Sequence, residues 1–384
     1  MPLQVAVAGA GFSGAVVARV LAEAGHHVDV FDDRDHVAGN CHTERDADTD
    51  VMLHVYGPHI FHTQWSHVWD YVNRFGRFEP YSHKVKATAQ GHVYSLPVNL
   101  LTINQFFGKT LSPGQAQDLV ASLGDATIEE PVSFRDQGLR FLGKELYEAF
   151  FDGYTRKQWG VDPSELPASI LKRLPVRFNY DDTYFDHPFM GIPVDGYTAL
   201  VEGILDHPDI AVQLGRRVHR GELAGYHHCF WTGPIDTYFD DEFGPLGYRT
   251  LDFEVERHDG DYQGCPVMNY CDATVPHTRI TEFKHFAPWE RHDRTVIYRE
   301  FSRACGPLDI PYYPIRQVRE KAQLRSYVEL ARTAERTTFL GRLGTYRYLD
   351  MDVTIKEALE AGGRFLGCLS SGDPVPAFFT DPLG

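Results

Sequence analysis

Three glycines and one aspartate near the N-terminus have a spacing that suits phosphate and ribose binding. Gly9, Gly11 and Gly14 form a GxGxxG pattern, and Asp32 follows 23 positions after Gly9. Such glycines permit a tight turn and a close approach to a pyrophosphate, and the carboxylate can hold a ribose 2′-hydroxyl. The pattern therefore indicates a dinucleotide, but it does not distinguish NAD from FAD.

The surrounding segments have the order that this pattern requires. Residues 3–8 form an apolar run typical of a buried strand, residues 15–24 favour a helix, and residues 27–31 form a second strand. In this strand–helix–strand unit the helix N-terminus faces the phosphates. The polar loop 33–40 that follows is either a second cofactor turn, as in FAD enzymes, or a plain surface turn.

A run of arginines and tyrosines at 341–354 leads into an acidic segment near the C-terminus. Asp350 and Asp352 are both residue types that cap helices, and Thr354 with Glu357 fits a capping box. We expect a helix to begin close to Asp350. Its partial positive charge would suit an electron-rich ligand edge such as the pyrimidine end of a reduced flavin. The alternative is an ordinary strand–turn–helix corner.

Composition excludes several classes of protein. The 384 residues carry 37 basic and 53 acidic side chains, a net charge of −16, so non-specific nucleic-acid binding is not expected. The six cysteines form no CxxC or metal-ligand spacing, which predicts reduced thiols in a cytoplasmic protein and no metal site. No basic residue precedes the apolar N-terminus, so we expect neither a signal peptide nor a membrane span.

The remaining segments predict an α/β protein with two additions to its dinucleotide domain. Residues 115–123 and 134–150 read as helices, 158–177 as a proline-bearing loop, and 251–313 as alternating antiparallel strands, before a last strand near 338–341. We predict a Rossmann-like dinucleotide-binding domain with an inserted helical domain and an antiparallel β-sheet domain. The expected ranges are 1–75, 195–235 and 317–384 for the first, 100–180 for the helical insert, and 76–99, 181–194 and 236–316 for the sheet.

The chain resembles the UDP-galactopyranose mutase family in five segments, which occur in the same order and are spread over nearly the whole chain. They are 9–14, 154–159, 232–236, 311–314 and 341–354. The resemblance implies FAD, active when reduced, and interconversion of UDP-galactopyranose and UDP-galactofuranose by attack of flavin N5 on the anomeric carbon. No net redox change would occur. UDP-galactose and UDP would be the partners, a homodimer the assembly, and cell-surface polysaccharide biosynthesis the setting.

The resemblance also assigns residues. It places the substrate diphosphate at Arg173 and Arg279, which an acidic protein needs as local counter-charge. It implies catalytic roles for Arg279, Arg173, Asp350, Glu300 and His62. Substrate binding is implied for Phe150, Phe151, Tyr154, Trp159, Arg173, Tyr184, Asn269, Arg279, Tyr313 and Tyr348. FAD binding is implied for Gly9, Gly11, Phe12, Ser13, Gly14, Asp32, Asn40, His59, Ile60, the strand-end residue Val218, Arg342, Asp350, Met351 and Thr354.

One position departs from the family pattern, since Ala38 replaces the first of two glycines before Asn40. Alanine is acceptable there unless the position needs a positive φ. Two other functions fit the same fold: an FAD-dependent oxidoreductase of the amine-oxidase type, and a flavin-bearing UDP-sugar binding protein without catalysis. Two features favour the mutase, because an amine oxidase would need neither: the pair Arg173 and Arg279, and the aromatic platform for uridine formed by Phe150, Phe151 and Tyr154. We also predict that loop 158–177 closes over UDP.

Overall fold

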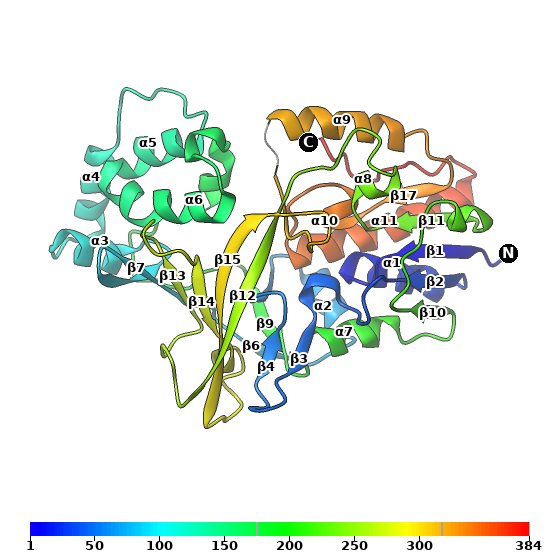
Figure 1. Cartoon of the computed structure of the whole chain (residues 1–384), viewed down its shortest axis with the longest axis horizontal. Coiled ribbons are helices and arrows are strands. Elements are labelled where there is room, and N and C mark those ends of the chain that lie inside the picture. Colours follow the sequence, from blue (N-terminus) through cyan, green and yellow to red (C-terminus); the bar gives the residue numbers. More distant parts are fainter. Residues whose placement is uncertain (174–175, 316–317, 384) are drawn as a thin grey trace.

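The computed structural model describes residues 1–173, 176–315 and 318–383, and for residues 172, 173, 318 and 319 it describes the backbone alone. Helices α3 to α6 gather at one end of the molecule, and the long strands β12 and β15 cross its middle (Figure 1). A parallel sheet with its helices forms the other end, where the N-terminus lies. The predicted α/β class is confirmed.

The parallel sheet has the strand order β10-β2-β1-β11-β17, and all four pairings are parallel. Its strands come from distant parts of the chain: β1 (Gln4–Ala8), β2 (His27–Phe31), β10 (Ile210–Gln213), β11 (His228–Trp231) and β17 (Thr337–Phe339). The last strand predicted from sequence is therefore confirmed as part of this sheet. Both ends of the chain are needed to build it.

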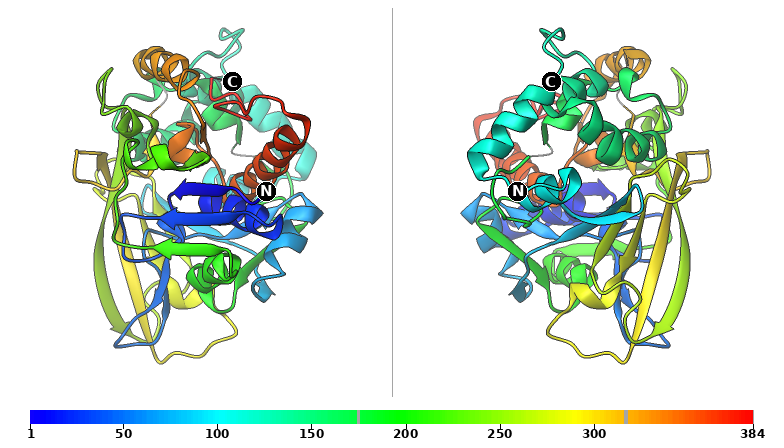
Figure 2. Two further views of the ribbon diagram at one scale, coloured as in Figure 1. Left: turned by 90° about the vertical axis from the view of Figure 1, so that its right-hand side faces the viewer. Right: turned by 90° about the vertical axis from the view of Figure 1, so that its left-hand side faces the viewer.

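Alternate residues of the central strand enter two different cores. Val5 and Val7 pack on one face, whereas Ala6 and Ala8 pack on the other, as the two-residue period of a strand requires. The first face is covered by α1 (Phe12–Glu23), α7 (Gly196–Leu205) and α11 (Met351–Ser371), and the second by α8 (Ile235–Tyr238) and α9 (Val318–Ala331). Figure 2 shows the red C-terminal helix beside the blue N-terminal segment.

A second, seven-stranded sheet has the order β16-β12-β15-β14-β13-β7-β8 and is antiparallel except where β13 meets β7. Its strands are β7 (Val85–Ala89), β8 (His92–Leu96), β12 (Tyr248–Asp259), β13 (Val267–Tyr270), β14 (Arg279–Glu282), β15 (Arg294–Ala304) and β16 (Tyr313–Pro314). Two small sheets accompany it. One pairs β3 (Thr43–Arg45) with β4 (Met52–His54), and the other has the order β5 (Phe61–Thr63), β9 (Phe189–Pro193), β6 (Phe78–Pro80). Helix α2 spans Ser66–Val72.

The helices at the other end share a separate core of buried apolar side chains. They are α3 (Leu100–Phe107), α4 (Pro113–Leu123), α5 (Phe134–Tyr147) and α6 (Gly153–Trp159). The segment 134–150, predicted as a helical stretch, is helical, but it is not one regular α-helix. Gly143 has φ 74° and ψ 166°, which bends α5, and a wider helical turn at Glu148–Asp152 then leads into α6. Short helices at Pro163–Glu165 and Ala168–Arg173 occupy the expected loop.

The C-terminal helix α11 begins at Met351, with Asp350 as its N-cap residue, close to where the sequence predicts it. Asp350 makes no side-chain capping bond within the described chain. The capping box of Thr354 and Glu357 is wrong, because both Glu357 oxygens accept from the Arg347 guanidinium at 2.9 Å. None of the helices described here is both long and apolar enough to cross a membrane.

Candidate functional site

A cavity of about 1210 Å³ opens at the C-terminal ends of the parallel strands. The first glycine of GxGxxG turns the chain there with φ 110°, and a Cβ on Gly9 would lie 2.0 Å from Thr232 Oγ1. Only glycine fits this position, as the pattern predicts. The cavity is lined by 11 of the 14 predicted cofactor residues: Gly9, Gly11, Phe12, Ser13, Asp32, Asn40, His59, Val218, Arg342, Met351 and Thr354.

Both ends of the chain form the wall of this cavity. Gly11 is the N-cap residue of α1 and has no side chain, so the first N–H groups of that helix are open to an anion. Gly341 has φ 78°, and a Cβ there would approach Ser13 Oγ to 2.4 Å. The short helix α10 (Gly341–Gly344) is thereby held against α1. Asp32 accepts bonds from the N–H groups of Ala10 (2.7 Å) and Arg34 (3.0 Å).

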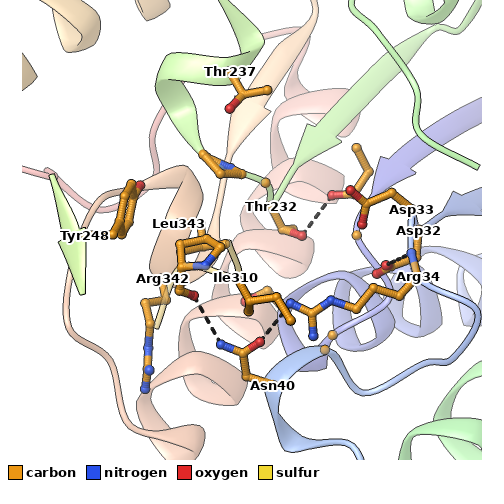
Figure 3. A pocket seen from close by; sticks show the side chains of 18 of the residues that line it. Asp32, Asp33, Arg34, Asn40, Thr232, Thr237, Tyr248, Ile310, Arg342 and Leu343 are labelled. Carbon is orange, nitrogen blue, oxygen red and sulfur yellow. Dashed lines mark hydrogen bonds between the residues drawn. The ribbon is translucent and has the colours of Figure 1, made fainter. Parts of the chain in front are cut away.

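Asn40 links two sides of the cavity (Figure 3). Its Oδ1 accepts from Arg34 Nη2 at 2.8 Å, and its Nδ2 donates to Pro311 O at 3.2 Å. Ala38, two residues earlier, has φ 72° and is buried. The position thus has a positive φ, which is the exception to the expectation that alanine is acceptable there, and an L side chain is disfavoured in this region.

Three predicted cofactor residues lie elsewhere. Gly14 packs α1 on the sheet, since a Cβ there would lie 1.9 Å from Gly9 O. Ile60 and Asp350 line a second cavity instead. Val218 does line the large cavity, but it lies in the connection after β10 and not at a strand end, so that detail of the prediction is wrong.

The second cavity has a volume of about 280 Å³ and adjoins the first. Asn40, Tyr56, His59, Arg342 and Met351 line both of them. A ligand lying in the cradle of the parallel sheet would therefore contact residues that also face the smaller cavity. The smaller cavity is floored by the seven-stranded sheet, whose residues Val267, Asn269, Arg279 and Glu300 face it.

An ion pair forms part of the wall of the smaller cavity. Arg279 on β14 and Glu300 on β15 are opposite each other in the antiparallel register, with Arg279 Nε 3.0 Å from Glu300 Oε1. Thr278 Oγ1 donates to the same oxygen at 2.9 Å. Although burial disfavours its charge, the Glu300 carboxylate raises the pKa of Arg279 well above the usual value. A permanent cation is thus fixed in the wall of the cavity.

Four predicted tyrosines and one asparagine share this cavity: Tyr154, Tyr184, Tyr313, Tyr348 and Asn269. The rings of Tyr313 and Tyr348 stack with centroids 5.7 Å apart, and the Arg342 guanidinium lies 5.0 Å from the Tyr348 centroid. Burial raises the pKa of Tyr154, Tyr184 and Tyr313. Their hydroxyl groups therefore stay protonated and can donate to phosphate oxygens.

Histidines form the remaining wall. His62 Nδ1 lies 2.8 Å from His187 Nδ1, and the His62 ring stacks on Phe185 at 3.7 Å. Burial lowers the pKa of His62 to about 4, against the opposing effect of the Asp350 carboxylate. His83 also lines the cavity, is buried, and its Nδ1 has no partner among the described residues. The sequence interpretation missed His83, because no motif surrounds it.

Several predicted substrate residues are not brought into either cavity. Of the described side chains, those of Phe150, Phe151 and Trp159 line neither one. Phe150 belongs to the core of the helical layer, where its ring meets that of Tyr94 edge-on at 5.1 Å. The side chain of Arg173 falls outside the described residues. The binding roles of these four residues remain predictions.

One cluster has metal-ligand types, namely Asp261, Glu282 and His285. The Glu282 oxygens already accept from the backbone N–H groups of Tyr262, Gln263 and Gly264. The Lys284 ammonium contacts the Asp261 carboxylate. This cluster therefore contains its own cation, and its geometry is explained without a metal.

Comparison with known proteins identifies relatives over almost the whole chain. The family model described as UDP-galactopyranose mutase matches residues 149–348, and a model of NAD(P)-binding Rossmann-like domains matches residues 7–75. A Klebsiella pneumoniae protein named "Probable UDP-galactopyranose mutase" is 58% identical over 372 residues, covering 97% of both chains. A dTDP-fucopyranose mutase of Escherichia coli is 54% identical, covering 94% of this chain and 98% of the other.

Solved structures show the same fold at low sequence identity. A crystal structure of reduced UDP-galactopyranose mutase superposes with a TM-score of 0.72 at 15% identity, covering 95% of this chain and 96% of the other. Wild-type putrescine oxidase bound to putrescine gives 0.58 at 13% identity, covering 96% and 99%. At such low identity these similarities establish the fold alone. Because a mutase and an amine oxidase share this fold, the fold does not distinguish between the two functions.

Proposed function

Because the chain belongs to the UDP-galactopyranose mutase family, we propose that it interconverts UDP-galactopyranose and UDP-galactofuranose without net oxidation or reduction. The cofactor we propose is FAD in its reduced state. The observation that carries this proposal is that the two cavities adjoin. The cradle for a dinucleotide shares five lining residues with a smaller cavity that contains a fixed cation and several tyrosine hydroxyls.

The residues of the large cavity fit FAD. The open N–H groups of α1 suit a pyrophosphate, Asp32 suits a ribose, and the N-terminus of α11 lies where the two cavities meet. When bound and reduced, the flavin would supply the nucleophile that attacks the anomeric carbon. Ile60, Asp350 and Met351 would meet its ring system, because they line the smaller cavity.

The protein supplies position and charge. Arg279 would hold the substrate diphosphate, and the hydroxyls of Tyr154, Tyr184, Tyr313 and Tyr348 would donate to its oxygens. This replaces water around the leaving diphosphate with fixed donors. Asn269 would contact the uridine. If the 158–177 segment closes, Phe150, Phe151 and Trp159 would contact the uridine as well. In that closed state Arg173 would bind the diphosphate together with Arg279.

Three further groups are proposed to act in the reaction. Glu300 orients Arg279, because its carboxylate accepts from the guanidinium at 3.0 Å. His62 and Asp350 line the cavity and would lie against the flavin and the sugar. We infer that His62 acts as a neutral ring, since burial lowers its pKa to about 4.

The decisive test is a redox-controlled assay. Purified protein reduced with dithionite should convert UDP-galactofuranose to UDP-galactopyranose, and the same protein in its oxidised form should not. An absorbance spectrum of the purified protein should show bound flavin. Conversion by the oxidised protein would refute the reduced-flavin mechanism. UDP binding without turnover in either state would instead indicate a binding protein, and oxidation of an amine would indicate the alternative oxidoreductase.

A second substrate deserves the same assay, because the 54% identical relative is named a dTDP-fucopyranose mutase. That identity is close to the 58% of the relative named for UDP-galactopyranose. We propose UDP-galactose as the preferred substrate. The competing substrate is dTDP-fucose in its pyranose and furanose forms, and a higher kcat/KM for dTDP-fucofuranose would reverse the assignment.

The cellular setting belongs to the same proposal. We propose a cytoplasmic homodimer whose furanose product serves cell-surface polysaccharide biosynthesis. The free state of all six cysteines supports a reducing compartment. We also retain as a proposal the division into a discontinuous FAD-binding domain, a helical insert and a sheet domain.

A further inference from the structure

Lys157 on helix α6 makes three bonds to the backbone of the segment that runs from the end of β13 to the start of β14. Its Nζ donates to Tyr270 O at 2.6 Å, to Asp272 O at 3.0 Å and to His277 O at 3.0 Å. An ammonium group has three N–H donors, so all of its hydrogen-bonding capacity is used on backbone carbonyls. Neither cavity includes Lys157 in its lining.

The loop that Lys157 holds connects two strands of the cavity floor. It joins β13 to β14, and Asn269 and Arg279 face each other at its base in the antiparallel register. Both of these residues line the smaller cavity. A shift of the loop would therefore move the predicted uridine contact and the diphosphate cation together.

Helix α6 also approaches this loop through a glycine. A Cβ on Gly153 would lie 2.4 Å from Cys271 O and 2.9 Å from Ala273 N. Gly153 and Lys157 are four residues apart, so they share one face of the helix. Tyr154 is on the same helix and lines the cavity. Helix α6 thus carries both Tyr154, which lines the cavity, and Lys157, which binds the loop between Asn269 and Arg279.

The other side of α6 is fixed by the seven-stranded sheet. Gln158 O accepts from Arg249 Nε at 3.1 Å and from Ser302 Oγ at 2.7 Å. Arg249 is buried, so this attachment at the helix C-terminus is shielded from water. Because one side of the helix is anchored here, the Lys157 bonds determine where the β13–β14 loop lies relative to Tyr154.

We propose that Lys157 is a positioning residue for the nucleotide site: its ammonium group sets the distance between Tyr154 and the pair Asn269 and Arg279. This inference rests on the proposed function, since it assumes that these residues bind a nucleoside diphosphate. It predicts that nucleotide affinity depends on the charge of a side chain that does not touch the nucleotide.

The proposed attachment is sensitive to pH. Burial lowers the pKa of Lys157 to about 8, although Cys271 and Asp272 oppose this effect. The other titratable or charged groups nearby are His277 on the loop, whose pKa burial lowers to about 4, and Arg299 on β15. On α6 itself there is Arg156, which is paired with Asp152 and Asp162. A neutral amine donates only two hydrogens, so one carbonyl loses its donor as pH rises through about 8.

The test is calorimetric titration of the flavin-loaded protein with UDP between pH 7 and 9.5. We expect the affinity of the unaltered protein to fall about threefold with a midpoint near pH 8. Lys157→Met should bind UDP about tenfold more weakly at pH 7 and should show no such step. Lys157→Arg, which stays charged over this range, should keep most of the affinity and also lose the step. Lys144→Met, at a site 75% exposed, is the matched control and should change nothing.

The results separate this inference from the proposed function. A flat profile for the unaltered protein, or the same step in Lys157→Met, would overturn the positioning role. Flavin content reports whether each variant is folded. If Lys157→Met loses flavin, Lys157→Arg decides the question, because a pH step that persists in this variant would overturn the positioning role. If the unaltered protein bound no UDP at pH 7, the proposed function would fail, and this inference with it.

Discussion

Removal of the Arg279 guanidinium should separate two roles of its ion pair with Glu300. Arg279→Met keeps much of the side-chain length but leaves Glu300, which is 1% exposed, with Thr278 Oγ1 as its remaining side-chain donor. A buried carboxylate without its cation is costly, whereas replacing both partners by neutral groups often costs little. We therefore expect Arg279→Met to destabilise the protein more than Arg279→Met combined with Glu300→Gln.

The magnitude follows from the burial of the pair. Breaking a buried ion pair by removing one partner costs about 3–5 kcal/mol. The double variant should recover about 2 kcal/mol of that loss, because a glutamine can still accept from Thr278 without a charge. Turnover should not recover in either variant. Loss of a charge-assisted bond to the diphosphate, worth about 1.5–3 kcal/mol, lowers kcat/KM by about 10- to 150-fold or more.

Two measurements check this reasoning: urea unfolding of the single and double variants, and the dithionite-reduced mutase assay. Arg299→Met is the matched control, because Arg299 precedes Glu300 on β15 and is bound by the partly exposed Glu254 and Glu256. It should cost about 1 kcal/mol or less and leave turnover and flavin content unchanged. Near-normal activity of Arg279→Met, or no recovery of stability in the double variant, would refute the assignment.

Three other perturbations have expected outcomes. Ala38→Gly should raise the free energy of unfolding of flavin-free protein by about 0.5–1 kcal/mol, because Ala38 has φ 72°. The control Ala121→Gly in helix α4 should lower the free energy of unfolding by about as much. A lower free energy of unfolding for Ala38→Gly would contradict this reasoning. Gly341→Ala should reduce the ratio of flavin to protein absorbance, since its Cβ would meet Ser13 Oγ at 2.4 Å, and full flavin occupancy would count against the cradle. Saturating UDP should slow proteolysis within 158–177, and equal cleavage rates with and without UDP would argue against closure of that segment.

Local patterns gave the N-terminal unit correctly. The GxGxxG segment, α1, β2 and Asp32 lie within about thirty residues, so short-range signals were sufficient. The start of α11 at Met351 was likewise readable from the acidic residues before it. The alternation of β14 predicted an antiparallel strand, although its place between β13 and β15 depends on distant partners.

Other features depend on tertiary contacts and could not be read locally. Gly143 looks like a tolerated glycine in a helix, yet it bends α5 where a Cβ would lie 2.6 Å from Leu123. The positive φ of Ala38 contradicts the intrinsic preference of alanine. His83 reaches the cavity only because β7 and its neighbours form one wall of it. The domain borders and the individual site roles remain predictions.

The parallel sheet has a consequence for biosynthesis. Its edge strand β17 and the covering helix α11 are translated more than 300 residues after β1 and α1, against which the finished cradle is built. Contacts so distant along the chain form slowly, because a long loop must close before they stabilise anything. A ribosome-bound chain therefore cannot complete the cradle before its last segment emerges. A cofactor that contacts both walls of the cradle would bind the finished fold, and its binding energy would then stabilise the junction between these early and late segments.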